Sequence, residues 1–193
     1  MAADNALALG FFIRLPAFLI ALVVHEYAHG FAAYKRGDNT AKHMGRLTLN
    51  PLAHIDLFGT IILPLSLLML GAIPIGYAKP VPINFQNLHN PKKDIIWVGA
   101  AGPLANFITA GAVFIILNSG LISNGLLSYF LSIVLLVNIM IGAFNLIPIP
   151  PLDGSRILLG ILPNRWALKY MRLERYGIII IYVLLWFVWR VLR

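Results

Sequence analysis

The pattern of apolar and polar positions divides the chain into long apolar runs and short polar connections. Four runs have about the length of a membrane-spanning helix: residues 15–34, 94–118, 126–147 and 173–191. Pro16 stands where the first helix is able to begin, and Trp186 and Trp189 lie near the far end of the last run, as interfacial anchors do. A segment in lipid must satisfy its own backbone, so each run predicts a transmembrane helix.

A fifth apolar run, residues 58–72, is shorter and is interrupted by Pro64, and prolines and glycines crowd residues 73–91 after it. The run either crosses the membrane, with residues 73–91 returning as extended backbone, or it re-enters or rests on the surface. We therefore expect an all-α polytopic membrane protein with about five hydrophobic segments, four or five of them transmembrane helices. Near residues 73–91 we expect an extended or β-hairpin membrane-associated segment.

The composition agrees with this pattern. Hydrophobic residues make up 60% of the 193 positions and charged residues only 11%, which excludes an ordinary soluble domain. The apolar runs follow one another without a linker or repeat, so we expect one integral membrane domain covering residues 1–193. The chain has no cysteine, so any metal site must use nitrogen and oxygen ligands.

A net charge of +8 raises the question of nucleic-acid binding. The basic residues, however, gather in the connections at residues 35–56 and 163–175, between apolar runs. Basic connections face the cytosol in most membrane proteins, so we interpret the charge as a topology signal and expect no nucleic-acid partner.

The most specific chemical signal lies inside the first run, where His25, Glu26 and His29 form the pattern HExxH. Histidines four residues apart project from one face of a helix, so both imidazoles reach one ion while Glu26 lies beside a bound water. This arrangement is typical of zinc hydrolases. The alternative is a pair of histidines satisfied inside a helix bundle. Apolar surroundings make three ionisable residues costly, which favours the metal site.

A zinc hydrolase keeps three protein ligands, and Asp153 is the candidate for the third. It follows the proline-rich residues 148–152 at the cytosolic end of a predicted span, the end toward which His29 leans. Asp153 is also suited to cap the short apolar helix predicted at residues 156–162. Its depth favours the ligand role.

Other polar residues at membrane depth are candidates for contacting substrate. Asn106 and Asn145 carry amides that we expect to hold the substrate backbone or the oxyanion of the reaction. Asn106 is equally suited to an interhelical hydrogen bond. We expect His43, His54 and His89 in loops, with His54 near enough to the next apolar run to reach the site from its rim.

These groups predict a hydrolytic mechanism. Zinc lowers the pKa of its bound water and polarises the scissile carbonyl, while Glu26 takes the proton and delivers it to the leaving amine. A substrate at this depth is itself in the membrane, and its helix must unwind before its carbonyl is open to attack. We expect the extended residues 73–91 and 148–152 to pair with the unwound strand.

Four short motifs together resemble the site-2 protease family of intramembrane zinc metalloproteases: HEYAH at residues 25–29, GPLAN at 102–106, NLIP at 145–148 and LDG at 152–154. The chain is similar to the compact branch that lacks PDZ and CBS domains. The resemblance implies one zinc ion per chain and regulated cleavage of transmembrane segments of membrane proteins. The basic connections place the active site toward the cytosolic side, and we expect the membrane to be the plasma membrane of a prokaryote.

Residue by residue, the resemblance implies zinc ligands at His25, His29 and Asp153 and the catalytic acid and base at Glu26. It also implies substrate positioning by Asn145, and by Asn106 in a lesser part. The alternatives are a catalytically silent zinc-binding regulatory or scaffold protein, against which Glu26 argues, and a metal transporter. A transporter would need ionisable residues along other spans, where the sequence offers amides.

Overall fold

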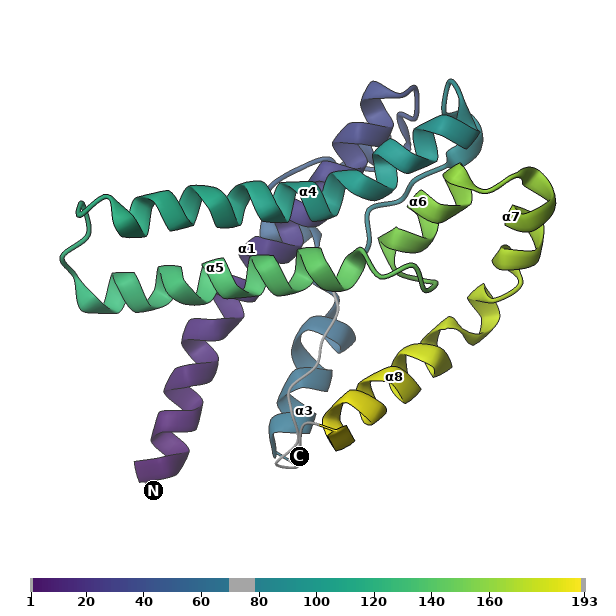
Figure 1. Cartoon of the computed structure of the whole chain (residues 1–193). Coiled ribbons are helices and arrows are strands. Elements are labelled where there is room, and N and C mark those ends of the chain that lie inside the picture. Colours follow the sequence, from purple (N-terminus) through teal and green to yellow (C-terminus); the bar gives the residue numbers. More distant parts are fainter. Residues whose placement is uncertain (1, 70–78, 192–193) are drawn as a thin grey trace.

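The computed structural model describes residues 2–69 and 79–191, and this part of the chain forms helices and loops with no β-strand (Figure 1). The α-helices are α1 (Ala2–Lys35), α2 (Thr40–His43), α3 (Leu63–Met69), α4 (Pro91–Asn118), α5 (Gly125–Asn145), α6 (Asp153–Ile161), α7 (Asn164–Met171) and α8 (Gly177–Val191). Short 3-10 turns are η1 (Pro51–Ala53), η3 (Phe85–Asn87) and η4 (Glu174–Tyr176), and η2 (Leu57–Ile62) is a π-helix leading into α3.

Among the described residues, three helices are long and apolar enough to cross a membrane: Ile13–Lys35 within α1, Pro91–Asn118 and Gly125–Asn145. They confirm three of the predicted spans. Large apolar side chains such as Ile108 and Ile115 are 72% and 69% exposed on α4, which in water would be unfavourable and in lipid is ordinary. The structure therefore supports an integral membrane protein.

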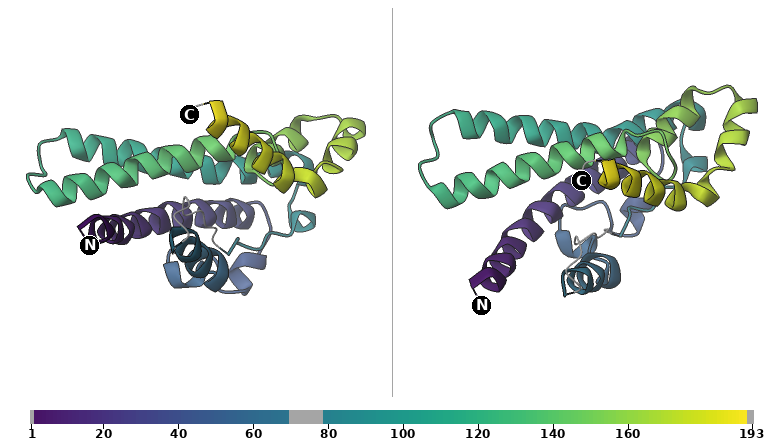
Figure 2. Two further views of the ribbon diagram at one scale, coloured as in Figure 1. Left: turned by 90° about the horizontal axis from the view of Figure 1, so that it is seen from below. Right: turned by 60° about the horizontal axis from the view of Figure 1, so that its bottom comes forward.

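Helix α4 lies at the centre of the molecule. It runs antiparallel beside α5 and also packs against α1 and α6, with α1 crossing the pair obliquely (Figures 1 and 2). Small residues permit this close approach: a Cβ added at Gly142 of α5 would lie only 3.3 Å from the carbonyl oxygen of Pro103 in α4. Ala17 and Ala21 of α1 are fully buried.

The start of α1 differs from the prediction. We expected the first helix to begin at residue 15 with Pro16 in its first turn, whereas α1 begins at Ala2 and contains Pro16 in its interior. Proline in a helix removes one backbone hydrogen bond, a loss that membrane helices tolerate where neighbouring groups compensate. The apolar residues before Arg14 are mostly good helix formers, so the helix continues through the proline.

The five-segment count is not confirmed. The connection at residues 163–175 contains α7, and the run predicted at 173–191 is reduced to α8, a helix of 15 residues or about 22 Å, shorter than a hydrocarbon core. The turn η4 separates α7 from α8. Gly177 packs there against the backbone of Pro150, so close that a side chain would not fit.

The predicted β-hairpin is not confirmed either. Residues 70–78 lie outside the described residues, and residues 79–84 form an irregular extended segment before η3. The described part of the apolar run predicted at 58–72 forms η2 and then α3, and the rest of that run lies outside the described residues.

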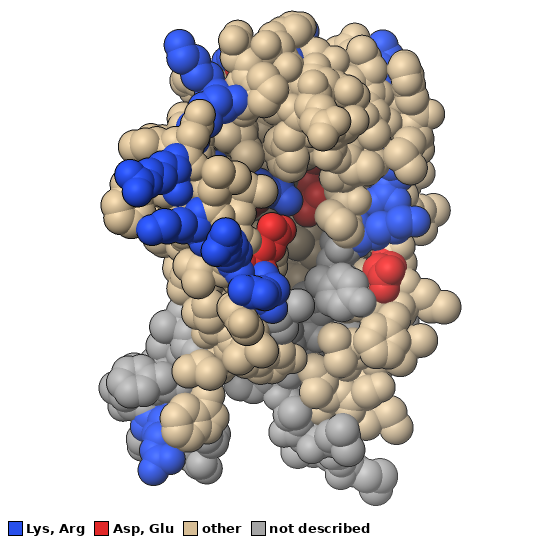
Figure 3. Space-filling view, turned by 90° about the vertical axis from the view of Figure 1, so that its right-hand side faces the viewer, with Lys and Arg blue, Asp and Glu red and all other residues tan. Residues whose placement is uncertain are grey.

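Basic residues gather at one end of the helices, around a hollow in which acidic side chains are visible (Figure 3). Arg36, just after α1, donates to the buried carboxylate of Asp94 in the first turn of α4 at 2.8 Å, which ties these two helix ends together. Asp38 is fully buried, and its carboxylate accepts hydrogen bonds from the backbone N–H of Asn84 and the amide of Asn87. These contacts position the segment before α4.

Candidate metal centre

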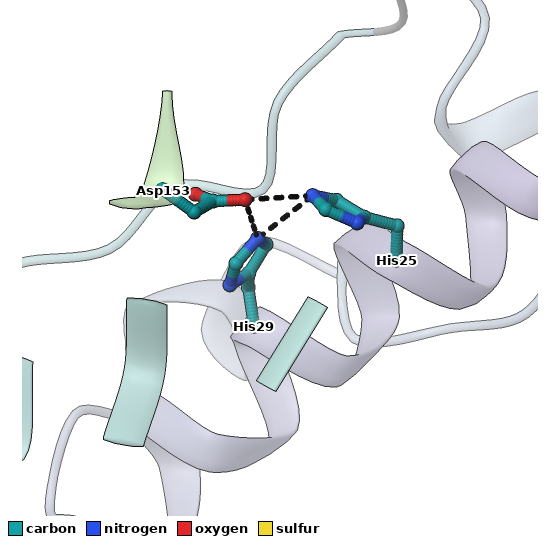
Figure 4. Close-up of side chains that lie close together, drawn as sticks. All are labelled: His25, His29 and Asp153. Atoms are coloured by element: carbon teal, nitrogen blue, oxygen red, sulfur yellow. Dashed lines mark hydrogen bonds and ion pairs between the residues drawn. The ribbon is translucent and has the colours of Figure 1, made fainter. Parts of the chain in front are cut away.

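The structure brings together His25, His29 and Asp153, although the aspartate lies 124 residues beyond His29 along the chain (Figure 4). Helix α1 presents both histidines from successive turns, and α6 presents Asp153 from its first turn. The Nε2 atoms of the two imidazoles are 3.0 Å apart, and the Oδ2 atom of Asp153 lies 2.9 Å from one and 3.1 Å from the other. All three side chains are buried.

Asp153 is not a helix cap. The residue at the N-cap position of α6 is Leu152, and Asp153 follows it inside the first turn with its Oδ2 atom directed at the histidines. Its carboxylate oxygen therefore faces both imidazoles at once.

The Nδ1 atom of each imidazole makes a hydrogen bond that indicates whether this nitrogen carries a proton. The Nδ1 atom of His29 lies 2.6 Å from the carbonyl oxygen of Val98, which only accepts, so Nδ1 donates and Nε2 is the nitrogen available to a metal ion when the imidazole is neutral. The Nδ1 atom of His25 lies 2.6 Å from Oδ1 of Asn106 and donates in the same way. This is the outer hydrogen bonding found for histidines that bind metals.

This arrangement fits a bound cation. The two Nε2 atoms and the Oδ2 atom of Asp153 lie within 3.1 Å of one another, and all three can bind one cation when the imidazoles are neutral. Ligand atoms around a tetrahedral zinc ion lie about 3.3 Å apart, as follows from metal–ligand distances of about 2.0 Å. Two imidazoles and one carboxylate form the donor set of a catalytic zinc site that keeps a fourth position open.

Gly102 of α4 provides the space beside this cluster. A Cβ added there would lie 2.7 Å from the Cε1 atoms of both His25 and His29, and closer still to Nε2 of His29. Real Cβ atoms do not approach other atoms so closely, so only glycine fits against the two imidazoles.

Glu26 lies next to the cluster on α1 and is half-buried. Its Oε2 atom accepts a hydrogen bond of 2.8 Å from the backbone N–H of Val81, in the extended segment at residues 79–84. The start of that segment is held by Arg46, whose guanidinium donates to the carbonyls of Lys79 and Pro80 at 2.9 and 3.3 Å. The extended segment therefore runs past the carboxylate that the HExxH pattern singles out.

The two asparagines predicted to contact substrate have different surroundings in the structure. Asn106 is fully buried behind His25, and its amide nitrogen donates to the carbonyl of Ala21 and to Oδ1 of Asn138. Both of its N–H groups are therefore occupied. Asn145 is half-buried at the end of α5, where its amide donates to the carbonyl of Ile141 in the same helix.

The three remaining histidines lie away from the cluster. His54 is buried, and its Nε2 atom is 2.8 Å from the carbonyl oxygen of Thr48, so it belongs to its own loop rather than to the rim of the site. His89 is exposed in a loop, as predicted, whereas His43 is exposed at the end of helix α2 rather than in a loop.

Three contributors escaped the sequence analysis: the carbonyl of Val98, the missing side chain of Gly102, and Asn138. Val98, Gly102 and Asn106 are spaced by four residues and so form one face of α4 opposite the two histidines. The sequence signal that could have identified this face is the four-residue spacing, with a glycine between a small apolar residue and an amide.

Comparison with known proteins gave a match to Peptidase family M50 over residues 13–121 and 118–188. The relatives include "Putative zinc metalloprotease YwhC" of Bacillus subtilis (strain 168), 39% identical over 183 residues that cover 88% of this chain and 80% of that protein. "Putative zinc metalloprotease Rip2" of Mycolicibacterium smegmatis is 29% identical and covers 91% of this chain and 67% of its own. No solved structure gave a significant match.

An archaeal relative extends the comparison. "Zinc metalloprotease MJ0392" of Methanocaldococcus jannaschii is 31% identical over 151 residues, which cover 77% of this chain and 34% of that longer protein. The family match and these relatives confirm the resemblance seen in the sequence motifs and make zinc the expected metal of the cluster. The chain therefore belongs to Peptidase family M50, the site-2 protease family of zinc metalloproteases.

Proposed function

We propose that this chain is an intramembrane zinc protease that hydrolyses peptide bonds in or near transmembrane segments of membrane proteins, as in regulated intramembrane proteolysis, and that residues 1–193 act as one domain. The observation that carries the proposal is a buried His–His–Asp cluster whose two histidines lie inside a candidate membrane span, with a glutamate beside them. A protease with its site at this depth acts on chains that are already in the bilayer.

In this proposal His25, His29 and Asp153 hold one zinc ion through Nε2, Nε2 and Oδ2. Zinc, when bound, lowers the pKa of a coordinated water and polarises the scissile carbonyl. The surrounding protein prepares the ligands: Val98 and Asn106 accept from the two Nδ1 atoms and so direct both Nε2 atoms inward, and the carboxylate of Asp153 would supply the negative charge. Because these groups are already oriented, the protein does not have to reorganise during the reaction.

Glu26 is the general base and acid. The Val81 N–H binds Oε2 and orients the carboxylate, so Oε1 is the atom that takes the proton from the attacking water. The same oxygen then delivers the proton to the leaving amine.

The substrate backbone is proposed to lie between the extended segment at residues 79–84 and the proline-rich residues 148–152. Both stretches lack regular structure, and a substrate strand must also be extended at the point of cleavage. Asn145 lies at the end of α5, just before the proline-rich stretch, and its amide is the proposed contact for the substrate backbone. Asn106, with both N–H groups occupied, is assigned to orienting His25 instead.

The location of the site follows from the charges. His29 lies six residues and His25 ten residues before Lys35, which places them about 9 and 15 Å from the basic end of α1. Basic ends face the cytosol, so the site opens toward the cytosolic side of what we propose is a prokaryotic plasma membrane. Peptide products released at this depth have a short path to the cytosol.

The test compares the wild type with Glu26→Gln in liposomes that contain a synthetic single-span peptide. One peptide carries Gly-Pro near mid-span and a matched peptide carries only leucines there. We expect the wild type to cleave the first peptide at least about 1,000-fold faster than Glu26→Gln, with equal zinc content in both proteins. Equal cleavage by the two proteins, or no cleavage by a zinc-loaded wild type, would favour a silent zinc-binding protein.

A further inference from the structure

Asn138 of α5 is a fully buried amide at the middle of a candidate span, and the proposed chemistry does not use it. Its Oδ1 atom accepts a hydrogen bond of 2.9 Å from the amide of Asn106, and its own amide donates to the carbonyl of Val134 at 2.8 Å. A buried amide in hydrocarbon is costly unless its groups are paired, so this residue has a specific function in the bundle.

The direction of the Asn138 side chain is fixed by its own helix. The Val134 carbonyl only accepts, so the nitrogen of Asn138 must face it and Oδ1 must face Asn106. A flipped side chain would put two oxygens against each other at Val134. Asn138 therefore presents a defined acceptor to α4.

That acceptor in turn fixes the amide of Asn106. The Asn106 nitrogen has two N–H groups and faces two acceptors, the Ala21 carbonyl at 3.0 Å and Oδ1 of Asn138 at 2.9 Å. The remaining atom, Oδ1, is left facing Nδ1 of His25 at 2.6 Å. Only an imidazole protonated on Nδ1 satisfies this contact, and in its neutral form such an imidazole has its Nε2 lone pair on the side of Asp153.

We propose that Asn138 is a positioning residue of the metal site, which acts through Asn106 to hold His25 in the orientation and tautomer that bind zinc. The proposal rests on the zinc site assigned above. It couples α5, which contributes no ligand, to a ligand on α1 by a chain of three hydrogen bonds through α4. Every atom of the chain is buried, so water does not replace a lost partner.

The test measures zinc affinity of purified protein in detergent by competition with a chromophoric chelator. Asn138→Leu removes the acceptor, and we expect about tenfold weaker zinc binding, the lower part of the range for losing an outer partner of a ligand. Asn138→Asp is expected to restore binding, because a protonated carboxyl group accepts from Asn106 and donates to Val134. Ser132→Ala is the matched control: the Ser132 hydroxyl is exposed on α5 and bonds only within that helix.

Two further measurements separate positioning from general stability. The absorption spectrum of the cobalt-substituted protein should change in Asn138→Leu and return in Asn138→Asp, since it reports ligand geometry. In the double variant Asn106→Leu/Asn138→Leu, zinc affinity should equal that of Asn106→Leu, because Asn138 acts only through Asn106. If Asn138→Leu does not fold, Asn138→Ser gives the same comparison, since its hydroxyl is too short to reach Asn106.

The proposal is overturned if Asn138→Leu lowers the melting temperature of the metal-free protein while zinc affinity and the cobalt spectrum stay at wild-type values. Additive losses in the double variant would overturn it as well. In both cases the proposed function would be unaffected, provided that the wild-type protein binds zinc. A wild type that binds no zinc would overturn the positioning role and the zinc site together.

Discussion

Replacing Gly102 by alanine tests the geometry of the metal centre, because this position touches the cluster without supplying a ligand. The added Cβ would stand 2.7 Å from Cε1 of both His25 and His29, whereas ordinary contacts between such atoms are about 3.5 to 4.0 Å. Either the imidazoles or α4 must therefore move by about 1 Å. Metal–ligand distances tolerate only about 0.2 Å, so a displacement of this size breaks the site.

We expect Gly102→Ala to weaken zinc binding by more than about 100-fold, beyond the usual effect of losing an outer hydrogen bond. Proteolysis should fall with it. The metal-free protein should lose about 1–3 kcal/mol of stability, as overpacked positions do. Zinc affinity is measured by chelator competition, zinc content by elemental analysis, and stability by the melting temperature in detergent with EDTA.

Gly111→Ala is the matched control. Gly111 lies in the same helix α4, is exposed, and would place its Cβ in open space with no atom within 4 Å. This variant should bind zinc and cleave substrate as the wild type does. The reasoning is refuted if Gly102→Ala binds one zinc ion with wild-type affinity, since the imidazoles would then have room that the structure denies them.

Three further variants test other contacts. Asp153→Asn keeps the shape but removes the charged ligand, so chelator competition should show zinc affinity lower by more than about 100-fold; unchanged affinity would exclude Asp153 as a ligand. Burial raises the pKa of Asp38, but its hydrogen bonds outweigh burial and lower it. Its stabilising effect is therefore complete above the ordinary value of 3.8 and lost as pH falls through the folded value, so the melting-temperature advantage over Asp38→Asn should shrink below pH 4. Asp94→Asn breaks a pair whose Arg36 is 39% exposed, and should cost less than about 1 kcal/mol in thermal melting; a larger loss would show a stronger link between α1 and α4.

The parts of this protein that could be predicted are those determined by local periodicity. Hydropathy over about 20 residues located the three spans, and the four-residue spacing of His25 and His29 was enough to assign them to one face of a helix. Asp153 could be placed because only a residue at the right depth and of the right charge reaches the histidines. Its location opposite them agrees with that prediction, and its ligand role is the proposal that Asp153→Asn tests.

The parts that could not be predicted depend on tertiary context. Pro16 suggested a helix start, yet the apolar residues before it continue the helix. The run at residues 173–191 had the composition of a span, but charged residues at its start and the packing of Gly177 against Pro150 divide it into a turn and a short helix. Asn106 has the same donors and acceptors whether it faces substrate or a histidine, and only its neighbours decide.

The packing of α4 against α1 explains why the geometry of the site cannot be deduced from the proposed ligands alone. His25 and His29 are separated by one turn, and α4 runs antiparallel to α1, so Val98 lies opposite His29 and Asn106 opposite His25. Gly102, midway between them, lets the helix approach near enough for both hydrogen bonds to form. A larger residue at 102 would separate the helices and remove both Nδ1 partners at once, and the two Nε2 lone pairs would lose their common direction. Helix α4 therefore sets the geometry of the two proposed ligands on α1, and substitutions along this one face of α4 should affect zinc binding more than substitutions of equal size on its lipid-facing side.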